Sequence, residues 1–171
     1  MIIIRELKPN LIDQNLKEML DEIPKVDEFL QTNNYNGKSI DEIKSMLEQS
    51  INQKVDVDND NVPQKTFVIY EDTLPIGLGG VRLAMTPFWL KHGGHLWYKI
   101  RPTKRKLGYA TKLTDFLVYY LSTQGIHTIY AQCNIDNIAS QKVLTNNHFV
   151  KYDNPLCPDW VDILFYKKEV N

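Results

Sequence analysis

The 171-residue sequence has few of the features that mark secreted, membrane-spanning or disulfide-bonded proteins. Its two cysteines, Cys133 and Cys157, have no recognisable spacing, which favours free thiols in a reducing cytosol. The longest apolar run, Phe116–Leu121, is far below the ~18 residues that cross a bilayer. The apolar start Met1–Ile4 is too short for a signal peptide. These absences predict a cytoplasmic protein that does not bind membranes.

Metal and nucleic-acid binding are not predicted either. The four histidines lack metal-ligand spacing, and the Asp-rich stretch that starts at Asp56 has Asn61 and Phe67 where a calcium loop needs Gly and Glu. The net charge of −1 and the lack of a long basic stripe argue against nucleic acid. The length predicts a single domain over residues 1–171, large enough to fold without disulfides or metals.

The near-neutral total hides an uneven distribution of charge. Residues 1–62 contain 7 Lys+Arg and 13 Asp+Glu, whereas residues 63–171 contain 13 and 8. Six basic residues fall within one 14-residue window: Lys99, Arg101, Lys104, Arg105, Lys106 and Lys112. A charged cluster is usually a solvated face, but the glycine within this one favours a site for a compact polyanion. The acidic N-terminal half predicts that the protein also acts on a cationic molecule.

Apolar periodicity predicts the N-terminal elements. Ile2–Glu6 is typical of a strand, and apolar residues at helical spacing follow from Pro9 to Pro24. A second helix is expected after Ser39, with Glu42 as the partner of a capping box. Residues 52–62 are expected to form a polar loop.

The rest of the sequence alternates between strand and helix patterns. Strands are expected at Thr66–Tyr70, Ile76–Met85, His95–Ile100, Ile126–Cys133, Phe149–Tyr152 and Val161–Lys168. Helices are expected at Tyr109–Leu121 and at about 137–147, and Pro87–Lys91 is expected to be a connection. This order predicts an α/β domain of the α+β type with a mixed sheet.

The segment between Ile100 and Tyr109 has the features of an anion site. Pro102 ends the preceding strand, because proline lacks the N–H that a strand ladder needs. The amphipathic helix that follows offers unpaired N–H groups and a partial positive charge at its start. Gly108 removes the side chain that would block a ligand. We therefore expect a pyrophosphate to bind here.

Two motifs in this region resemble those of a known family. Arg105-x-x-Gly108-x-Ala110 resembles motif A of the GCN5-related N-acetyltransferases, and residues 134–140 resemble motif B. Residues 93–102 resemble a bacterial branch of uncharacterised predicted acetyltransferases. The resemblance implies a mixed, mostly antiparallel central sheet of about seven strands, with helices on both faces. It also implies transfer of the acetyl group from acetyl-coenzyme A to an amine of a small molecule or protein by direct attack.

The resemblance assigns roles in coenzyme binding. Residues expected to bind acetyl-coenzyme A around motif A are Arg105, Lys106, Leu107, Gly108, Tyr109, Ala110 and Thr111. The backbone of Ile100 is expected to pair with the pantetheine arm, while Asn137 and Ser140 face the coenzyme from the other side. The arm would enter where the strands that end at Ile100 and Cys133 splay apart.

The sequence departs from the family at two catalytic positions. Leu144 stands where many members have a tyrosine acid, and Gly94 stands where the histone-modifying branch has a glutamate base. Tyr98, His95 and Asn134 are therefore the catalytic candidates. An alternative is a module that binds or senses coenzyme A without catalysis, and a different acyl donor is a third. Whether the chain forms a homodimer stays open.

Overall fold

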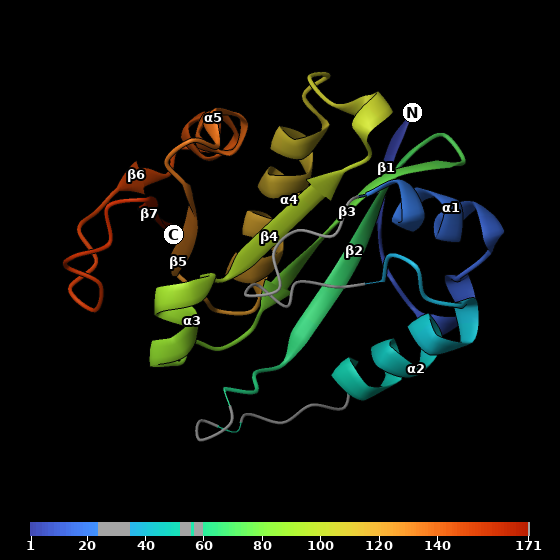
Figure 1. Cartoon of the computed structure of the whole chain (residues 1–171), viewed down its shortest axis with the longest axis horizontal. Helices are drawn as coiled ribbons and strands as arrows, with labels where there is room; N and C mark the ends of the chain where they lie inside the picture. Colours follow the sequence, from blue (N-terminus) through green and yellow to red (C-terminus); the bar gives the residue numbers. More distant parts are fainter. Residues whose placement is uncertain (24–34, 52–55, 57–59, 171) are drawn as a thin grey trace.

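The structure, a computed structural model, describes residues 1–23, 35–51, 56 and 60–170. Two antiparallel sheets run through these residues, a four-stranded sheet in the order β1-β2-β3-β4 and a three-stranded sheet in the order β5-β7-β6 (Figure 1). Their strands are β1 Ile2–Glu6, β2 Gln64–Glu71, β3 Leu74–Arg82, β4 Leu96–Ile100, β5 Thr128–Asn134, β6 Val150–Lys151 and β7 Ile163–Glu169. The helices are α1 Gln14–Glu22, α2 Ile40–Ile51, α3 Pro87–His92, α4 Tyr109–Thr123 and α5 Ile138–Asn146.

Helices cover both faces of the four-stranded sheet, as predicted. Successive residues of β2 point to opposite faces: Phe67 and Ile69 pack in the core beneath α4, and Val68 packs in a second core beneath α1 and α2. On α4, Leu113 and Leu117 are fully buried, and each contributes roughly 1.5–3 kcal/mol by leaving water. This layering confirms the α+β class.

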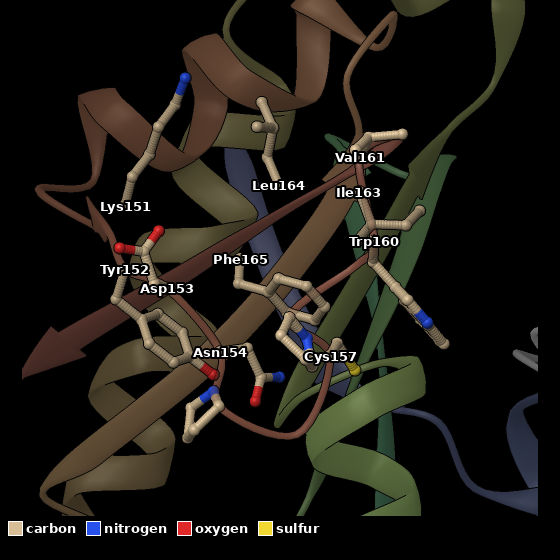
Figure 2. A pocket seen from close by; sticks show the side chains of 12 residues that line it. Lys151, Tyr152, Asp153, Asn154, Cys157, Trp160, Val161, Ile163, Leu164 and Phe165 are labelled. Atoms are coloured by element: carbon tan, nitrogen blue, oxygen red, sulfur yellow. The ribbon is translucent and has the colours of Figure 1, made fainter.

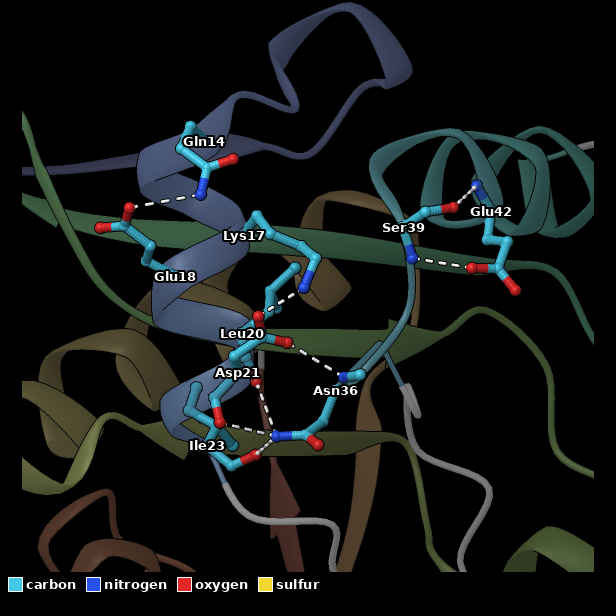
Figure 3. Close-up of polar contacts among 10 residues, drawn as sticks. Gln14, Lys17, Glu18, Leu20, Asp21, Ile23, Asn36, Ser39 and Glu42 are labelled. Atoms are coloured by element: carbon cyan, nitrogen blue, oxygen red, sulfur yellow. Dashed lines mark hydrogen bonds and ion pairs between the residues drawn. The ribbon is translucent and has the colours of Figure 1, made fainter.

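The first helix begins later than the apolar pattern predicted. Pro9–Leu11 forms a 3₁₀ turn, and α1 starts at Gln14 because the Asp13 carboxylate accepts the Leu16 N–H at 2.9 Å. At the other end of α1, the Asn36 side chain donates to the Asp21 carbonyl at 2.7 Å (Figure 3).

The second helix has the predicted capping box. The Ser39 N–H donates to the Glu42 carboxylate at 2.7 Å, and the Glu42 N–H donates to the Ser39 hydroxyl at 3.2 Å (Figure 3). Most of the expected polar loop 52–62 lies outside the described residues.

The expectation of a plain connection at Pro87–Lys91 was wrong. The segment forms the short helix α3, because the Thr86 hydroxyl caps the Trp89 N–H at 3.3 Å and Pro87 occupies the first turn.

In the described residues, no helix is long and apolar enough to cross a membrane. No group of three or more His, Cys, Asp or Glu side chains is placed there to hold a metal ion.

In the part of the chain that the structure describes, main-chain hydrogen bonds join the two sheets at one junction, just before β4. The His95 N–H donates to the Tyr130 carbonyl at 2.7 Å, and the Tyr130 N–H donates to the His95 Nδ1 at 3.0 Å. Gly94, with φ of +72°, forms a bridge to Ala131. A Cβ atom on Gly94 would lie 2.3 Å from the Tyr130 carbonyl oxygen, so the two backbones approach this closely only at a glycine.

We expect Gly94→Ala to lower the free energy of unfolding by at least ~3 kcal/mol, because strain and a clash with rigid backbone act together. Gly125→Ala is the matched control, since Gly125 has φ of +77° and no heavy atom within 4 Å of a Cβ. The free energy of unfolding of the control should fall by only about 1–2 kcal/mol. Urea unfolding of both variants measures the difference, and equal losses would contradict the role of the junction.

Candidate functional site

Beyond the junction, the free edge of β4 carries main-chain groups that β3 does not use. The Arg82 N–H donates to the His95 carbonyl, and the Arg101 N–H donates to the Ile76 carbonyl. Successive residues of a strand direct their main-chain groups to opposite edges, so these two bonds show which residues between His95 and Arg101 face β3. Lys99 therefore directs its N–H and C=O toward β3. Tyr98 and Ile100 direct theirs to the opposite edge, which faces β5.

Along β5, too, the main-chain groups of alternate residues face β4. Because the main-chain groups of Tyr130 face β4 at the junction, those of Gln132 and Asn134 face the same way. No hydrogen bond joins Tyr98 or Ile100 to Gln132 or Asn134 in the described chain. We call these two facing edges the strand gap. Its unpaired groups can pair with an extended chain that carries amides.

Part of the strand gap is already occupied by bonds within the protein. The Ile100 carbonyl accepts the Arg105 Nε at 3.1 Å, and the Asn134 carbonyl accepts the Asn137 N–H at 2.9 Å. These bonds join each edge to the segment that follows it.

The loop after β4 presents a run of unpaired N–H groups. Gly108 caps α4 in a left-handed conformation with φ of +80°, and no side chain caps the helix. The first helical bond recorded runs from Lys112 to Gly108 at 3.1 Å, and the N–H groups of residues 108–111 have no acceptor among the described residues. Nothing lies within 4 Å of a Cβ built on Gly108. Unpaired N–H groups at a helix start are suited to a phosphate group, and the binding of a pyrophosphate here stays a prediction.

Five of the six clustered basic residues, all except Lys99, divide into two groups. The Arg101 guanidinium binds the Glu22 carboxylate, with the Nε at 2.8 Å, and Lys104 binds Glu71. The cations near the start of α4 that have no ion pair within the described chain are Arg105, Lys106 and Lys112, and all three are exposed. The loop therefore keeps free positive charge beside the unpaired N–H groups.

Glu71 connects the two ends of the loop. One carboxylate oxygen accepts the Tyr109 hydroxyl and the other binds the Lys104 ammonium. The hydrogen bond from Lys104 has the larger effect and that from Tyr109 the next, and together they hold the pKa of Glu71 below its ordinary value. Because Lys104 precedes the loop and Tyr109 begins α4, Glu71 fixes both ends of the segment between them.

A polar cluster lies where α5 begins. The hydroxyls of Tyr98 and Ser140 are 2.8 Å apart, and the Cys133 thiol also interacts with Ser140. Burial raises the pKa of Tyr98 and of Cys133, so both groups keep their protons at neutral pH. The Asn137 side chain accepts the Ser140 N–H at 3.0 Å and so caps α5.

The other catalytic candidates have different surroundings. His95 is buried, and burial followed by the charge of Arg82 lowers its pKa to about 4. Its Nδ1 is engaged by Tyr130, which leaves the Nε2 as the nitrogen that carries the proton of the neutral ring. Asn134 is exposed at the end of β5. Catalytic roles for both stay predictions.

The two departures from the family pattern have structural explanations. Leu144 is 1% exposed and packs in the core, while Gly94 has no space for a side chain.

Sequence reasoning missed the roles of Glu22 and Glu71 at the loop. Their partners are 33 to 79 residues away, and no local motif marks such pairs.

Comparison with known proteins agrees with this geometry. The model of the acetyltransferase (GNAT) domain matches residues 2–150. A search among curated proteins found no significant match.

Solved structures share the fold at low identity. RimL, a ribosomal L7/L12 α-N-protein acetyltransferase in complex with coenzyme A, is 16% identical with a TM-score of 0.67, over 99% of this chain and 94% of that one. A spermidine N-acetyltransferase chimera from Vibrio cholerae SpeG and hSSAT is 17% identical with a TM-score of 0.65, over 98% and 95%. YncA of Salmonella typhimurium, with acetyl-coenzyme A, is 15% identical with a TM-score of 0.63, over 99% and 94%.

The family model covers most of the chain, and the fold and both motif regions agree with it. The chain therefore belongs to the GNAT acetyltransferase family, whose acyl donor is acetyl-coenzyme A.

Proposed function

We propose that this protein transfers the acetyl group of acetyl-coenzyme A to a primary amine of a small molecule or protein, with the reaction in the strand gap. The observation that carries the proposal is the run of unpaired N–H groups at residues 108–111, flanked by exposed cations and adjoining two unpaired strand edges. Similar folds include enzymes named for acetylation of a ribosomal protein and of spermidine, which supports an amine as the acceptor.

The residues present fit the coenzyme. The N–H groups at the start of α4 suit the pyrophosphate, with Arg105 and Lys106 adding charge. The pantetheine arm carries amides, which match the main-chain groups of Tyr98 and the N–H of Ile100, whose carbonyl is held by Arg105. One of the gap-facing N–H groups of β4 would then lie beside the thioester carbonyl and stabilise the negative charge that develops on its oxygen.

The acceptor must lose a proton before it attacks, because an alkyl ammonium has an ordinary pKa near ~10.4. The sites of the family's usual base and acid, Gly94 and Leu144, hold no ionisable group. We infer that the amine loses its proton to water. The rate should therefore rise with pH as the fraction of neutral amine rises.

The leaving thiolate needs a proton, and the hydroxyl pair of Ser140 and Tyr98 is suited to supply it. We infer that Ser140 donates directly, that Tyr98 replaces that proton across the 2.8 Å contact, and that water, which took the proton of the amine, returns one to Tyr98. Asn137 orients this pair, since it fixes the first turn of α5 through the Ser140 N–H.

The predicted cationic acceptor and the cytoplasmic location remain proposals. Three carboxylates of the acidic N-terminal half are paired in the described residues, Glu6 with Lys65, Asp21 with Lys17 and Glu22 with Arg101. Their charge contributes less to attracting a cation than the composition suggested.

Gly108→Glu should abolish coenzyme binding, because its carboxylate would occupy and repel the pyrophosphate site. Gly125→Glu is the matched control at the other end of α4, with φ of +77° against +80° and equally open surroundings. Calorimetry with coenzyme A should detect no binding to the first variant and unchanged binding to the second. Retained affinity in the Gly108 variant would refute the assignment.

Glu71→Gln should raise the KM for acetyl-coenzyme A about fivefold with little change in kcat, because the loop loses the charge that holds Lys104 and Tyr109. Asp72→Asn removes the neighbouring charge, whose recorded partner is the N-terminal ammonium, and should leave KM unchanged. Steady-state kinetics compares the two. If both variants change KM equally, the effect comes from the net charge of this region and not from the contacts of Glu71 with Lys104 and Tyr109.

Wild-type protein should release free thiol from acetyl-coenzyme A in the presence of a suitable primary amine. Ser140→Ala should reduce kcat at least ~100-fold and leave coenzyme affinity intact, because it removes a proton donor but not the Asn137 contact with its backbone. Ser122→Ala, a serine exposed on α4, is the control. Tight coenzyme binding without turnover across an amine panel would favour the sensing module instead.

A further inference from the structure

A surface pocket lies on the face of the three-stranded sheet that is turned away from α4 and α5. Its volume is about 500 Å³, and it is lined by β7 and by the segment before it, residues 151–162 (Figure 2). In β7, Leu164 and Tyr166 pack in the core that α4 covers, so Phe165 between them points to the other face. The pocket therefore lies on the side opposite the coenzyme loop.

The ladder between β5 and β7 connects this pocket to the strand gap. Ile163 lines the pocket and pairs with Asn134, and Phe165 pairs with Gln132. Side chains of directly opposed residues in an antiparallel pair share a face. The side chains of Asn134 and Gln132 thus lie on the pocket's face, while their main-chain groups line the gap. Asn134 therefore lies between Ile163, which lines the pocket, and the strand gap.

Three of the twelve lining residues are aromatic: Tyr152, Trp160 and Phe165. The ring of Phe165 lies 6.2 Å from those of Tyr152 and Trp160, measured between centroids. Trp160 is 40% exposed, so it borders solvent. Lys151 also borders the pocket, but it pairs with Tyr166 and its ammonium lies 6.0 Å from that ring, on the other face of the sheet. This lining and volume suit an apolar, flat group of a small molecule.

We propose that the pocket binds the apolar body of the amine acceptor and selects an aromatic group. The inference rests on the proposed function, because it needs the amine nitrogen to extend from the pocket into the gap. Asn134 then lies between the bound ring and the reacting nitrogen, where its amide oxygen can accept a hydrogen bond from the amine. This gives Asn134 a positioning role.

The test compares 2-phenylethylamine with ethylamine as acceptors. We expect a KM at least ~10-fold lower for the aromatic amine. Trp160→Ala should raise that KM about tenfold without changing the KM of ethylamine or of acetyl-coenzyme A, and Trp160→Phe should restore most of the loss. Tyr119→Ala removes an exposed ring on α4 and should have no effect.

Calorimetry with 2-phenylethylamine and coenzyme A separates this inference from the proposed function. Binding that Trp160→Ala weakens about tenfold supports the pocket even if no amine is acetylated. The inference is overturned by equal KM values for the two amines, by a preference for 1,4-diaminobutane, or by binding that is absent or unaffected by the Trp160 variant.

Discussion

The contact between Gly94 and Tyr130 sets the geometry on which the site depends. It joins the two sheets at one place, where the His95 N–H reaches the Tyr130 carbonyl. The buried Arg82 guanidinium supports this junction by donating to the Gly94 carbonyl at 2.9 Å and lying 3.7 Å from the Trp89 ring. Because pairing stops after the junction, the edges beyond it keep their main-chain groups for a ligand.

The charges around the coenzyme loop are divided between structure and binding. Glu22 and Glu71 neutralise two of the clustered cations and in doing so hold both flanks of the loop. The exposed cations beside the unpaired N–H groups keep their charge for the pyrophosphate. A loop that was wholly neutralised would bind anions weakly, and one without these carboxylates would have to be ordered by the ligand, at a cost in affinity.

The two faces of the strand gap have different chemistry, which suits two substrates of different kinds. The face toward α4 and α5 carries unpaired N–H groups, cations and the hydroxyl pair of Tyr98 and Ser140. The other face carries the aromatic pocket beside Asn134. Donor and acceptor can therefore approach from opposite sides without competing for the same groups.

The sequence by itself determined the layered α+β fold and the capping box at Ser39, and it predicts the coenzyme loop at Arg105–Ala110. Each is encoded within a few residues, by apolar periodicity, by a capping pair or by glycine and basic residues at a helix start. Only the tertiary structure decided that Gly94 lies too close to Tyr130 to carry a base, that Glu71 fixes the loop and that Tyr98 meets Ser140. These contacts join residues 33 to 42 positions apart, and local patterns do not specify which distant strands approach each other or how closely.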